Sequence, residues 1–464
     1  MRIEKDLLGE VTLPDEVYYG IHTARALENF QLTGQKVHPR LIEAIALIKK
    51  AAAEVNGELG YVSSDIAQAI GVAAGEVAEG QWQEQFVVDA LQGGAGTSTN
   101  MNVNEVLAAR ANEILVGSKQ GPIHSLDHVN RHQSTNDVYP TALRIAAVWL
   151  LQPLSEVCAQ LQESLQAKEE EFAGVIKVGR TEMQDALPIT LGQEFSAYAQ
   201  AIARDRWRLY KVEERLRQTN LGGTAVGTGL NAEKKYIFGV NERIRRYANI
   251  GLARAENMID VTQNADVFVE VSGLLKALAV NLSKLANDIR LMSSGPRAGL
   301  AEISLPIRQA GSSIMPGKVN PVIPEAINQV AFQVMAADLA VTLAAQSGQL
   351  ELNAFMPLIA YHLLNSIEVL TKGVIMFDHY CIKGIQANVE RCSQLVKDSL
   401  IEVTALVPYI GYEQATKIAK LSYLNNRTIR QIAVELNIMT EERLEEVLNP
   451  RALTHPGVVG KKLK

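Results

Sequence analysis

The stretch GSSIMPGKVNP, Gly311 to Pro321, gathers two serines, two glycines, two prolines, a lysine and an asparagine into eleven residues. Ala- and Leu-rich segments with helical spacing lie on both sides of it. Glycine and proline interrupt helices, so the stretch predicts a mobile polar loop between two helical segments. What such a loop does in a helical protein depends on the polar segments elsewhere in the chain.

Four long segments carry apolar residues spaced three and four apart, which is the period of one helical face. These stripes run through Leu150–Leu165, Leu191–Thr219, Val271–Ile289 and Ile327–Leu343. Stripes of about 16 to 29 residues exceed the ordinary globular helix, which averages about eleven residues. Because such long apolar faces need partner helices, the sequence predicts a mainly all-α protein with a central helical bundle that is also buried between subunits.

Composition and charge narrow the class of protein. The 464 residues are 47% hydrophobic and 21% charged, and the net charge is −6 with both signs interspersed. We therefore expect no nucleic acid and no anionic membrane as partner. No uninterrupted apolar run of about 18 residues occurs, so no membrane-spanning segment is expected. Three cysteines, an odd number, and a charged N-terminus without a signal-peptide core indicate a cytoplasmic protein.

From about Val389 the pattern changes to shorter units. YEQATKIAKLSYL, RTIRQIAVELN and TEERLEEVL are typical of three short helices, with Thr440 as the N-cap of the last. Helix-turn-helix DNA-binding domains share this arrangement, but here the last helix is acidic and no basic patch accompanies it. A small helical C-terminal domain is the preferred interpretation.

Five polar islands interrupt the helical pattern. They are GGAGTSTNMN (93–102), QSTNDVYP (133–140), GRTEMQD (179–185), GGTAVGTG (222–229) and the loop at 311–321. None contains the phosphate-binding pattern G-x-x-x-x-G-K-[ST], and none follows a clear strand within a βαβ unit. The sequence therefore favours neither a P-loop nor a Rossmann dinucleotide site.

His124, His128 and His132 recur every four residues, a spacing that on a helix could present imidazoles to a metal ion. The same segment holds Asp127 and Asn130 and leads into the polar QSTND, so a stable helix is not expected there. Hydrogen-bonded or solvated histidines are the preferred interpretation, and no metal site is predicted.

The hydroxyls, amides and lysine of the islands are hydrogen-bond donors suited to carboxylates. They also suit the di-negative aci-carboxylate that forms when the carbon beside a carboxylate loses its proton. A loop flanked by glycine and proline could close over such a substrate and exclude water. The alternative is that each island only caps a helix, an explanation that weakens as the islands accumulate.

GSSIMPGKVNP resembles the signature of the fumarase/aspartase superfamily, and the resemblance extends over nearly the whole chain. The segments that fit the family are GGAGTSTNMNVNEVLA, HVNRHQSTNDVYPTA, LPITLGQEF, LGGTAVGTGLN and GQLELNAFMP, while RIEKDLLGEVTLPDEVYYGIHTARALENF and LTHPG resemble its aspartase branch. The resemblance implies three domains, at 1–136, 137–388 and 389–464, with the mobile loop 311–320 on a central five-helix bundle. It also implies a homotetramer with a twenty-helix core and active sites that each draw on three subunits.

The resemblance implies reversible deamination of L-aspartate to fumarate and ammonia without an organic cofactor; activation by divalent cations is not readable from the sequence. Ser312 matches the base that removes the proton beside the β-carboxylate. A serine can do so only if backbone N–H groups and the nearby Lys318 stabilise its anion. The residues matched to substrate binding are Thr97, Ser134, Thr135 and Ser313 for the β-carboxylate, Thr181, Lys318 and Asn320 for the α-carboxylate, and Asn136 for the amino group.

One position departs from the family pattern. Where many relatives have His directly after GRT and some aspartases have Gln, this chain has Glu182, which we expect to accept a hydrogen bond from the substrate's ammonium. Glu325 could face it, and two facing carboxylates would tend to share a proton. The nearest alternative is fumarate hydration on the same scaffold, which Glu182 and the N-terminal pattern disfavour. Argininosuccinate and adenylosuccinate lyases differ in the signature loop, and the intact Ser312, Lys318 and Asn320 argue against a purely structural lens protein.

Overall fold

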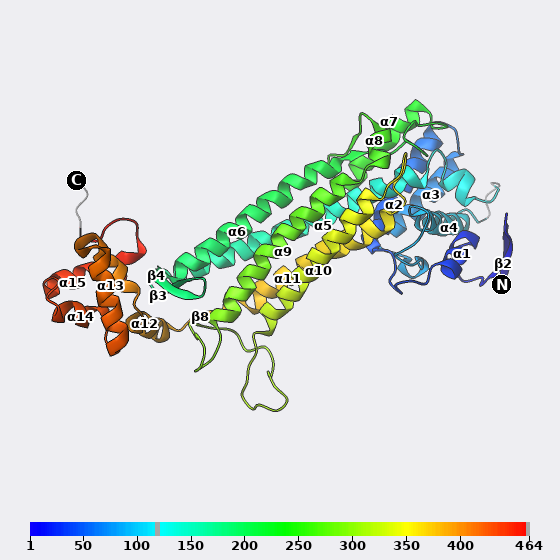
Figure 1. Ribbon diagram of the computed structural model, residues 1–464. Coiled ribbons are helices and arrows are strands. Elements are labelled where there is room, and N and C mark those ends of the chain that lie inside the picture. The colour runs from blue at the N-terminus through cyan, green and yellow to red at the C-terminus, as the bar shows by residue number, and fades with distance from the viewer. Residues whose placement is uncertain (117–120, 461–464) are drawn as a thin grey trace. The chain divides into compact units, whose positions relative to one another are not determined.

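The computed structural model describes residues 1–116 and 121–460 and is mainly helical, as the sequence predicts (Figure 1). The chain divides into two compact units. Unit 1 comprises Met1–Glu156, Asp205–Ala279 and Val330–Lys372, and unit 2 comprises Val157–Arg204, Val280–Gln329 and the chain from Gly373 onward. The three-domain division at 136/137 and 388/389 does not coincide with these ranges and stays a prediction.

Helices account for most of the chain. Their bounds are α1 (Ile21–Asn29), α2 (Pro39–Glu58), α3 (Ser64–Ala78), α4 (Thr97–Ile114), α5 (Thr135–Glu171), α6 (Leu191–Val212), α7 (Lys234–Ala248), α8 (Met258–Gln263), α9 (Asp266–Met292), α10 (Val322–Gln346), α11 (Met356–Tyr380), α12 (Val389–Asp398), α13 (Val407–Asn425), α14 (Ile429–Glu435) and α15 (Glu441–Val447).

The strands of the described residues form two-stranded sheets. They pair as β1 (Arg2–Asp6) with β2 (Gly9–Leu13), β3 (Ile176–Thr181) with β4 (Gln184–Thr190), β5 (Gln218–Thr219) with β6 (Ala253–Arg254), and β7 (Ile303–Ser304) with β8 (Gln386–Ala387). The β5–β6 pair is parallel and the others are antiparallel. Such short pairs pin loops in place and carry no core of their own.

Helix α2 shows how unit 1 is built. Pro39 stands in its first turn, where the missing N–H has no helical partner to lose, and the His38 side chain caps the helix by accepting from Arg40 N. On the inner face, side chains such as Leu41 and Ile45 are buried. The helix packs against α3 and α7. Burying each such aliphatic side chain contributes about 1.5–3 kcal/mol, which makes this face part of the core of unit 1.

All four predicted stripes lie on long helices, namely α5, α6, α9 and α10. The second helix is shorter than expected, because α6 ends at Val212 and a 3-10 turn and β5 continue to Thr219. A further long helix, α11, was not predicted from any stripe. Helix α5 runs through Pro140 and Pro153. At Pro140 the lost helical bond is replaced, because the freed carbonyl of Asn136 accepts from the side-chain amide of Asn220 at 2.9 Å.

Helix α10 leaves an apolar face uncovered within this chain. Ile327, Val334 and Val341 are buried, whereas Phe332 and Leu339 are 58% and 61% exposed. By length and composition alone, α5, α10 and the segment Met356–Gly384 are apolar enough to cross a membrane, a property that the search for uninterrupted apolar runs did not detect. In the α5 window 61% of the residues are buried inside the protein, against 39% in α10. Helix α10 therefore has apolar surface to offer a partner.

The C-terminal part of unit 2 has the short helices that the sequence predicts. Helices α13, α14 and α15 correspond to the three predicted units, and Thr440 caps α15 by accepting from Arg443 N, which confirms the predicted N-cap. Their shared core is formed by Leu406, Ile418, Ile429, Ile432, Ala433, Leu444, Val447 and Leu448. Helix α13 begins at Val407, before the predicted unit YEQATKIAKLSYL, and its helical geometry is interrupted at Gly411.

Candidate active site

The predicted site residues fall in both units. Thr97, Ser134, Thr135 and Asn136 belong to unit 1 and are called the unit 1 half. The other six, Thr181, Glu182, Ser312, Ser313, Lys318 and Asn320, belong to unit 2 and are called the unit 2 half.

Two helix N-termini form the unit 1 half. Thr97 is the first residue of α4 and Thr135 the first residue of α5, so both helices begin inside polar islands that were expected to be breaks. The unsatisfied N–H groups and the dipole of a helix N-terminus attract anions. Gly96, just before α4, has φ +93°, and a Cβ there would lie 2.3 Å from the ring of Tyr139. Only glycine lets this turn approach α5 so closely.

A buried polar layer supports these helix ends. Asn130 Oδ1 accepts hydrogen bonds from Lys49 Nζ at 3.0 Å, Asn100 Nδ2 at 3.2 Å and Asn104 Nδ2 at 3.1 Å. Asn130 Nδ2 in turn donates to Gln133 O, next to Ser134. Burial lowers the pKa of Lys49 to about 7. The layer thus ties the start of α4 to the segment that leads into α5.

Sequence reasoning did not identify this supporting layer. Lys49 lies within the apolar stripe of α2, where a lysine is ordinarily assigned to the exposed face. The sequence signal for the buried layer was a lysine at a position of the apolar stripe, on a helix whose other stripe residues are buried. Asp137 is also fully buried, and its place three residues after Ser134, the spacing of a capping box, could have marked it.

The histidines before α5 are hydrogen-bonded. Residues Ser125–Val129 form one π-helical turn, in which His128 Nδ1 accepts from His124 N at 2.9 Å. His132 Nδ1 lies 2.6 Å from Asn56 Oδ1. Among the residues that the structure describes, no cluster of three or more His, Cys, Asp or Glu side chains has the arrangement of a metal site.

In the unit 2 half, Thr181 and Glu182 stand at the tip of the β3–β4 hairpin, which the sequence analysis had taken for a loop. Glu182 and Met183 have φ of +53° and +68°, a left-handed conformation that costs a residue with a side chain about 1 kcal/mol or more. The tip is exposed. The positive φ values of Glu182 and Met183 form the turn that carries these exposed side chains.

The base of this hairpin is anchored by buried charges. Glu302, which is fully buried, contacts Arg180 at 2.8 Å and Lys177 at 3.2 Å, and Lys177 also contacts Glu194 at 2.8 Å. Burial raises the pKa of Glu194, while Lys177 opposes that shift. Separating one partner from such a network would leave a buried charge uncompensated, which is costly. The end of the hairpin nearest the protein is therefore held firmly, whereas its tip is exposed.

The loop 311–320 has neither helix nor strand and is bonded within itself. Ser312 Oγ accepts from the backbone N–H groups of Ile314 at 3.2 Å and Met315 at 2.9 Å. Lys318 Nζ donates to Asn320 Oδ1, and Asn320 Nδ2 donates to Gly311 O at 2.7 Å. These bonds place Ser312 Oγ in a small nest of N–H donors. Such a nest favours a negative oxygen over a neutral one.

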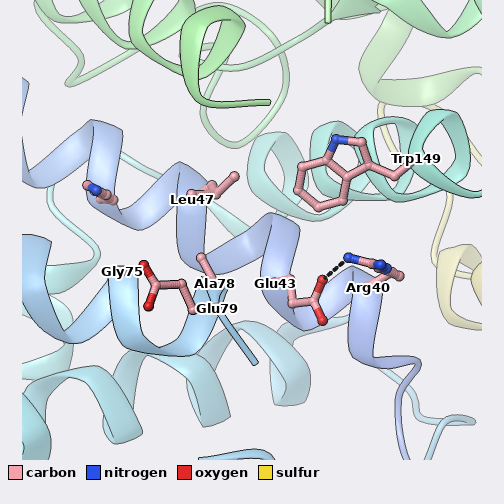
Figure 2. A pocket seen from close by; sticks show the side chains of 8 residues that line it. Arg40, Glu43, Leu47, Gly75, Ala78, Glu79 and Trp149 are labelled. Atoms are coloured by element: carbon pink, nitrogen blue, oxygen red, sulfur yellow. Dashed lines mark hydrogen bonds and ion pairs between the residues drawn. The ribbon is translucent and has the colours of Figure 1, made fainter. Parts of the chain in front are cut away.

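A different hollow lies against α2, α3 and α5 and has a volume of about 410 Å³ (Figure 2). Arg40 and Glu43, one turn apart on α2, form an ion pair at 2.8 Å along one side of it, and Trp149 forms another wall. Among the described residues that line it, none is a predicted site residue. The candidate site therefore rests on the two halves above.

The sequence of this chain matches two known protein families and a full-length relative. Residues 9–336 match the family described as Lyase, and residues 403–455 match the Fumarase C C-terminus. An aspartate ammonia-lyase from Bacillus sp. is 50% identical over 465 residues, covering 100% of this chain and 99% of that protein.

Two solved structures are similar along their whole length. The fumarate lyase:delta crystallin from Brucella melitensis bound to cobalt superposes with a TM-score of 0.94 at 46% identity, covering 98% of this chain and 100% of its own. The class II fumarase from Schistosoma mansoni also has a TM-score of 0.94, at 36% identity, covering 98% of this chain and 99% of its own.

Proposed function

The chain belongs to the fumarase/aspartase superfamily of lyases, and from that membership we propose that it is a carbon–nitrogen lyase that reversibly deaminates L-aspartate to fumarate and ammonia. Within the family, sequence identity supports aspartate deamination more strongly than fumarate hydration. Aspartate ammonia-lyase from Bacillus sp. is 50% identical over the full chain, whereas the fumarase from Schistosoma mansoni is 36% identical. Aspartate is therefore the substrate to test first, with malate as the competing one.

The observation that carries the proposed mechanism is the pair of backbone N–H groups on Ser312 Oγ. A serine hydroxyl is a poor base at neutral pH, and stabilisation of its anion by aimed donors makes proton abstraction feasible. In the proposed step the Ser312 alkoxide takes the proton from the carbon beside the β-carboxylate. The C–H electron pair moves into that carboxylate, which becomes di-negative, and returns as the C–N bond breaks and ammonia leaves.

The other residues are proposed to bind the two ends of the substrate. Thr97, Ser134, Thr135 and Ser313 would hold the β-carboxylate and its aci form, and the first three gain from their position at helix N-termini. Thr181, Lys318 and Asn320 would hold the α-carboxylate, and Asn136 and Glu182 would face the amino group. Elimination of ammonia changes no oxidation state that needs an electron acceptor, so the proposal includes no organic cofactor.

Assembly into a homotetramer is part of the proposal. The exposed apolar face of α10 fits burial against helices of other subunits, as expected for a twenty-helix core. A hairpin tip and a loop that are exposed in one chain fit sites completed by neighbouring chains. Cys158, Cys381 and Cys392 are buried and are not joined by disulfides, which fits a reducing cytoplasm as the location.

The direct test offers purified protein L-aspartate or L-malate in separate assays and follows fumarate by its ultraviolet absorbance. We expect fumarate from aspartate at a rate well above that from malate. Faster fumarate formation from malate would replace the proposed activity with fumarate hydration, and absence of product from both would remove it.

A further inference from the structure

Asp137 joins two polar islands that lie far apart in the sequence. Its side chain is fully buried. Oδ1 accepts from Ser134 N at 3.0 Å, which is one half of an ordinary capping box at the start of α5. Oδ2 accepts from Gly222 N and from Thr224 N, each at 3.0 Å. These last two bonds satisfy no helix end, so they serve the glycine-rich loop 222–229, which the proposed mechanism leaves unused.

The glycine-rich loop has a compact, defined conformation that is fixed by close backbone packing and by hydrogen bonds within the loop. Gly227 has φ +90°, and a Cβ there would lie 2.5 Å from the backbone of Ile259. Gly227 N and Gly229 N both donate to Gly223 O, at 3.0 and 2.9 Å. With Asp137 holding its first N–H groups, the loop presents the carbonyl of Ala225 at a fixed place.

That carbonyl orients a predicted substrate-binding residue. Asn136 Nδ2 donates to Ala225 O at 2.8 Å, and the Asn136 carbonyl accepts from Asn220 Nδ2 at 2.9 Å. The residue is thereby held at both its side chain and its backbone. With Nδ2 directed to the loop, Oδ1 is the acceptor that this amide can offer to an ammonium group.

We infer that Asp137 is a positioning residue for recognition of the substrate's amino group, acting through the loop 222–225 to orient the Asn136 amide. This inference rests on the proposed function, because it takes aspartate as the ligand. Fumarate lacks the amino group and needs no such acceptor. Asp137 therefore contributes to the discrimination of aspartate from fumarate, and little to binding of the carboxylates.

The groups that surround Asp137 make the orientation of the Asn136 amide depend on pH. It faces Lys49 of α2 and Tyr236 of α7, both buried. Burial raises the pKa of Asp137 to about 6, against the lowering effects of its three backbone N–H bonds and of Lys49. Above about pH 6 the ionised carboxylate accepts both loop N–H groups. Below it, the proton removes acceptor capacity, and the orientation of Asn136 weakens.

The principal test is Asp137→Asn. Asparagine keeps an Oδ1 acceptor for Ser134 N but places an NH₂ donor against the N–H groups of Gly222 and Thr224. We expect the KM for aspartate to rise about tenfold, the size of one lost hydrogen bond, while the inhibition constant of fumarate stays within about twofold. Because Asp137 acts through Asn136, the double variant Asp137→Asn/Asn136→Ala should be no weaker than Asn136→Ala alone.

Glu105→Gln is the matched control. Glu105 is also a buried carboxylate of unit 1 that accepts backbone N–H groups, from Gly20 at 2.9 Å and His22 at 2.8 Å, but these belong to the start of α1. We expect it to leave both constants near wild type. Equal losses for aspartate and fumarate in Asp137→Asn, or wild-type constants for both, would overturn the inference, as would additive effects in the double variant.

If Asp137→Asn does not fold, the wild-type enzyme decides the question. The ratio of aspartate to fumarate affinity is then measured at about pH 7 and about pH 5, on either side of the pKa of Asp137. A ratio that falls at least about threefold at the lower pH supports the inference, and an unchanged ratio overturns it. A wild-type protein inactive on aspartate would overturn the proposed function itself, whereas an active wild type with an unaffected Asp137→Asn would overturn this inference alone.

Discussion

The unit 1 half and the unit 2 half of the site are built on opposite principles. In unit 1, the side chains proposed to bind substrate stand at helix N-termini beside the buried Lys49 and Asp137 and the half-buried Asn130, whose bonds tie the segments together. In unit 2, buried charges such as Glu302 secure only the root of the hairpin, and the side chains predicted to act lie on exposed turns. A polar layer whose hydrogen bonds join several segments resists opening, whereas exposed turns with few buried contacts open at little cost.

This difference suggests a division of labour. The rigid half can bind one carboxylate without reorganisation, so its donors are aimed before substrate arrives. The exposed half must be ordered by substrate and by neighbouring subunits, which suits a loop that closes and excludes water. The proposed base, Ser312, lies on the loop of the unit 2 half, so under this proposal chemistry begins only after that loop closes.

The largest effect is expected from Ser312→Ala, which removes the proposed base from the exposed half. Turnover of aspartate should fall at least about a hundredfold, in line with positioned general-base catalysis. The fold and assembly should be unchanged, because the loop bonds mainly within itself. Steady-state fumarate formation and size-exclusion chromatography measure the two properties.

Ser313→Ala is the matched control for that experiment, because the neighbouring serine is proposed to bind the β-carboxylate and not to take the proton. It should raise KM more than it lowers kcat. If Ser312→Ala kept a tenth or more of wild-type activity, another group would have to be the base.

Glu182→Ala tests whether the exposed hairpin tip belongs to the site. A hydrogen bond to a charged group contributes about 1.5–3 kcal/mol, so kcat/KM for aspartate should fall roughly 10- to 150-fold. Glu182→Gln should be milder, because it keeps an acceptor for the ammonium. The measurement is steady-state kinetics on the intact oligomer.

Asp185→Asn provides the comparison, since Asp185 is an exposed carboxylate on the same hairpin. It should leave kcat/KM near wild type. Near-wild-type kinetics for Glu182→Ala as well would mean that Glu182 points to solvent or to a basic side chain of another subunit, and the hairpin tip would lose its role in amine binding.

Complementation tests whether the two halves meet across subunits. Ser134→Ala should inactivate the unit 1 half, and Lys318→Ala should inactivate the unit 2 half. If each site takes these residues from different chains, unfolding and refolding the two variants together should restore roughly a quarter of the sites in a random mixture. Each variant refolded alone is the control. Mixed tetramers that form without recovered activity would show that both residues come from one chain.

The sequence predicted the long helices well because their apolar stripes record a simple rule, burial on one face. Helix α11 was missed, although it buries Ile359, Leu363 and Ile367, which are spaced four apart on one helical face. The hairpin β3–β4 was missed because Glu182 and Met183 replace the Asn-Gly that normally marks such a turn. Positive φ on ordinary residues is visible only in three dimensions.

The candidate site was predicted only in part for a related reason. Residues that carry chemistry stand in polar islands, which interrupt a helical pattern and are easy to see. The residues that hold them, such as Lys49 and Asn104, lie inside helices and among apolar neighbours, where a single letter does not reveal that a charge or amide is buried. Their partners come from distant segments, as Asp137 and Gly222 do, and only the fold brings these together.

The smallest effect is expected in the stability of the rigid half as a function of pH. Burial raises the pKa of Asp137 from 3.8 to about 6, so the folded protein holds its proton more tightly than the unfolded chain. The stabilisation from this group is therefore fully present below about pH 4 and is lost as pH rises through about 6. Between about pH 5 and about pH 7 the wild type should lose about 1 kcal/mol of unfolding free energy that Asp137→Asn does not lose.

Asp89→Asn is the control, because the pKa of Asp89, in the same unit, is shifted in the opposite direction from that of Asp137. Burial acts to raise the pKa of Asp89, but bonds from the N–H groups of Leu91, Thr33 and Gly34 outweigh it, and the pKa is lowered. Its stabilisation is present at neutral pH and is lost only as pH falls below the ordinary range of Asp, so Asp89→Asn should leave the slope between pH 5 and 7 unchanged. Lys49 titrates from about pH 7 upward with its own sign, which is why the measurement stops there. Urea unfolding at fixed protein concentration measures all three proteins, and parallel slopes for wild type and Asp137→Asn would show that Asp137 stays ionised throughout, so that the rigid half carries no acid-sensitive element at this residue.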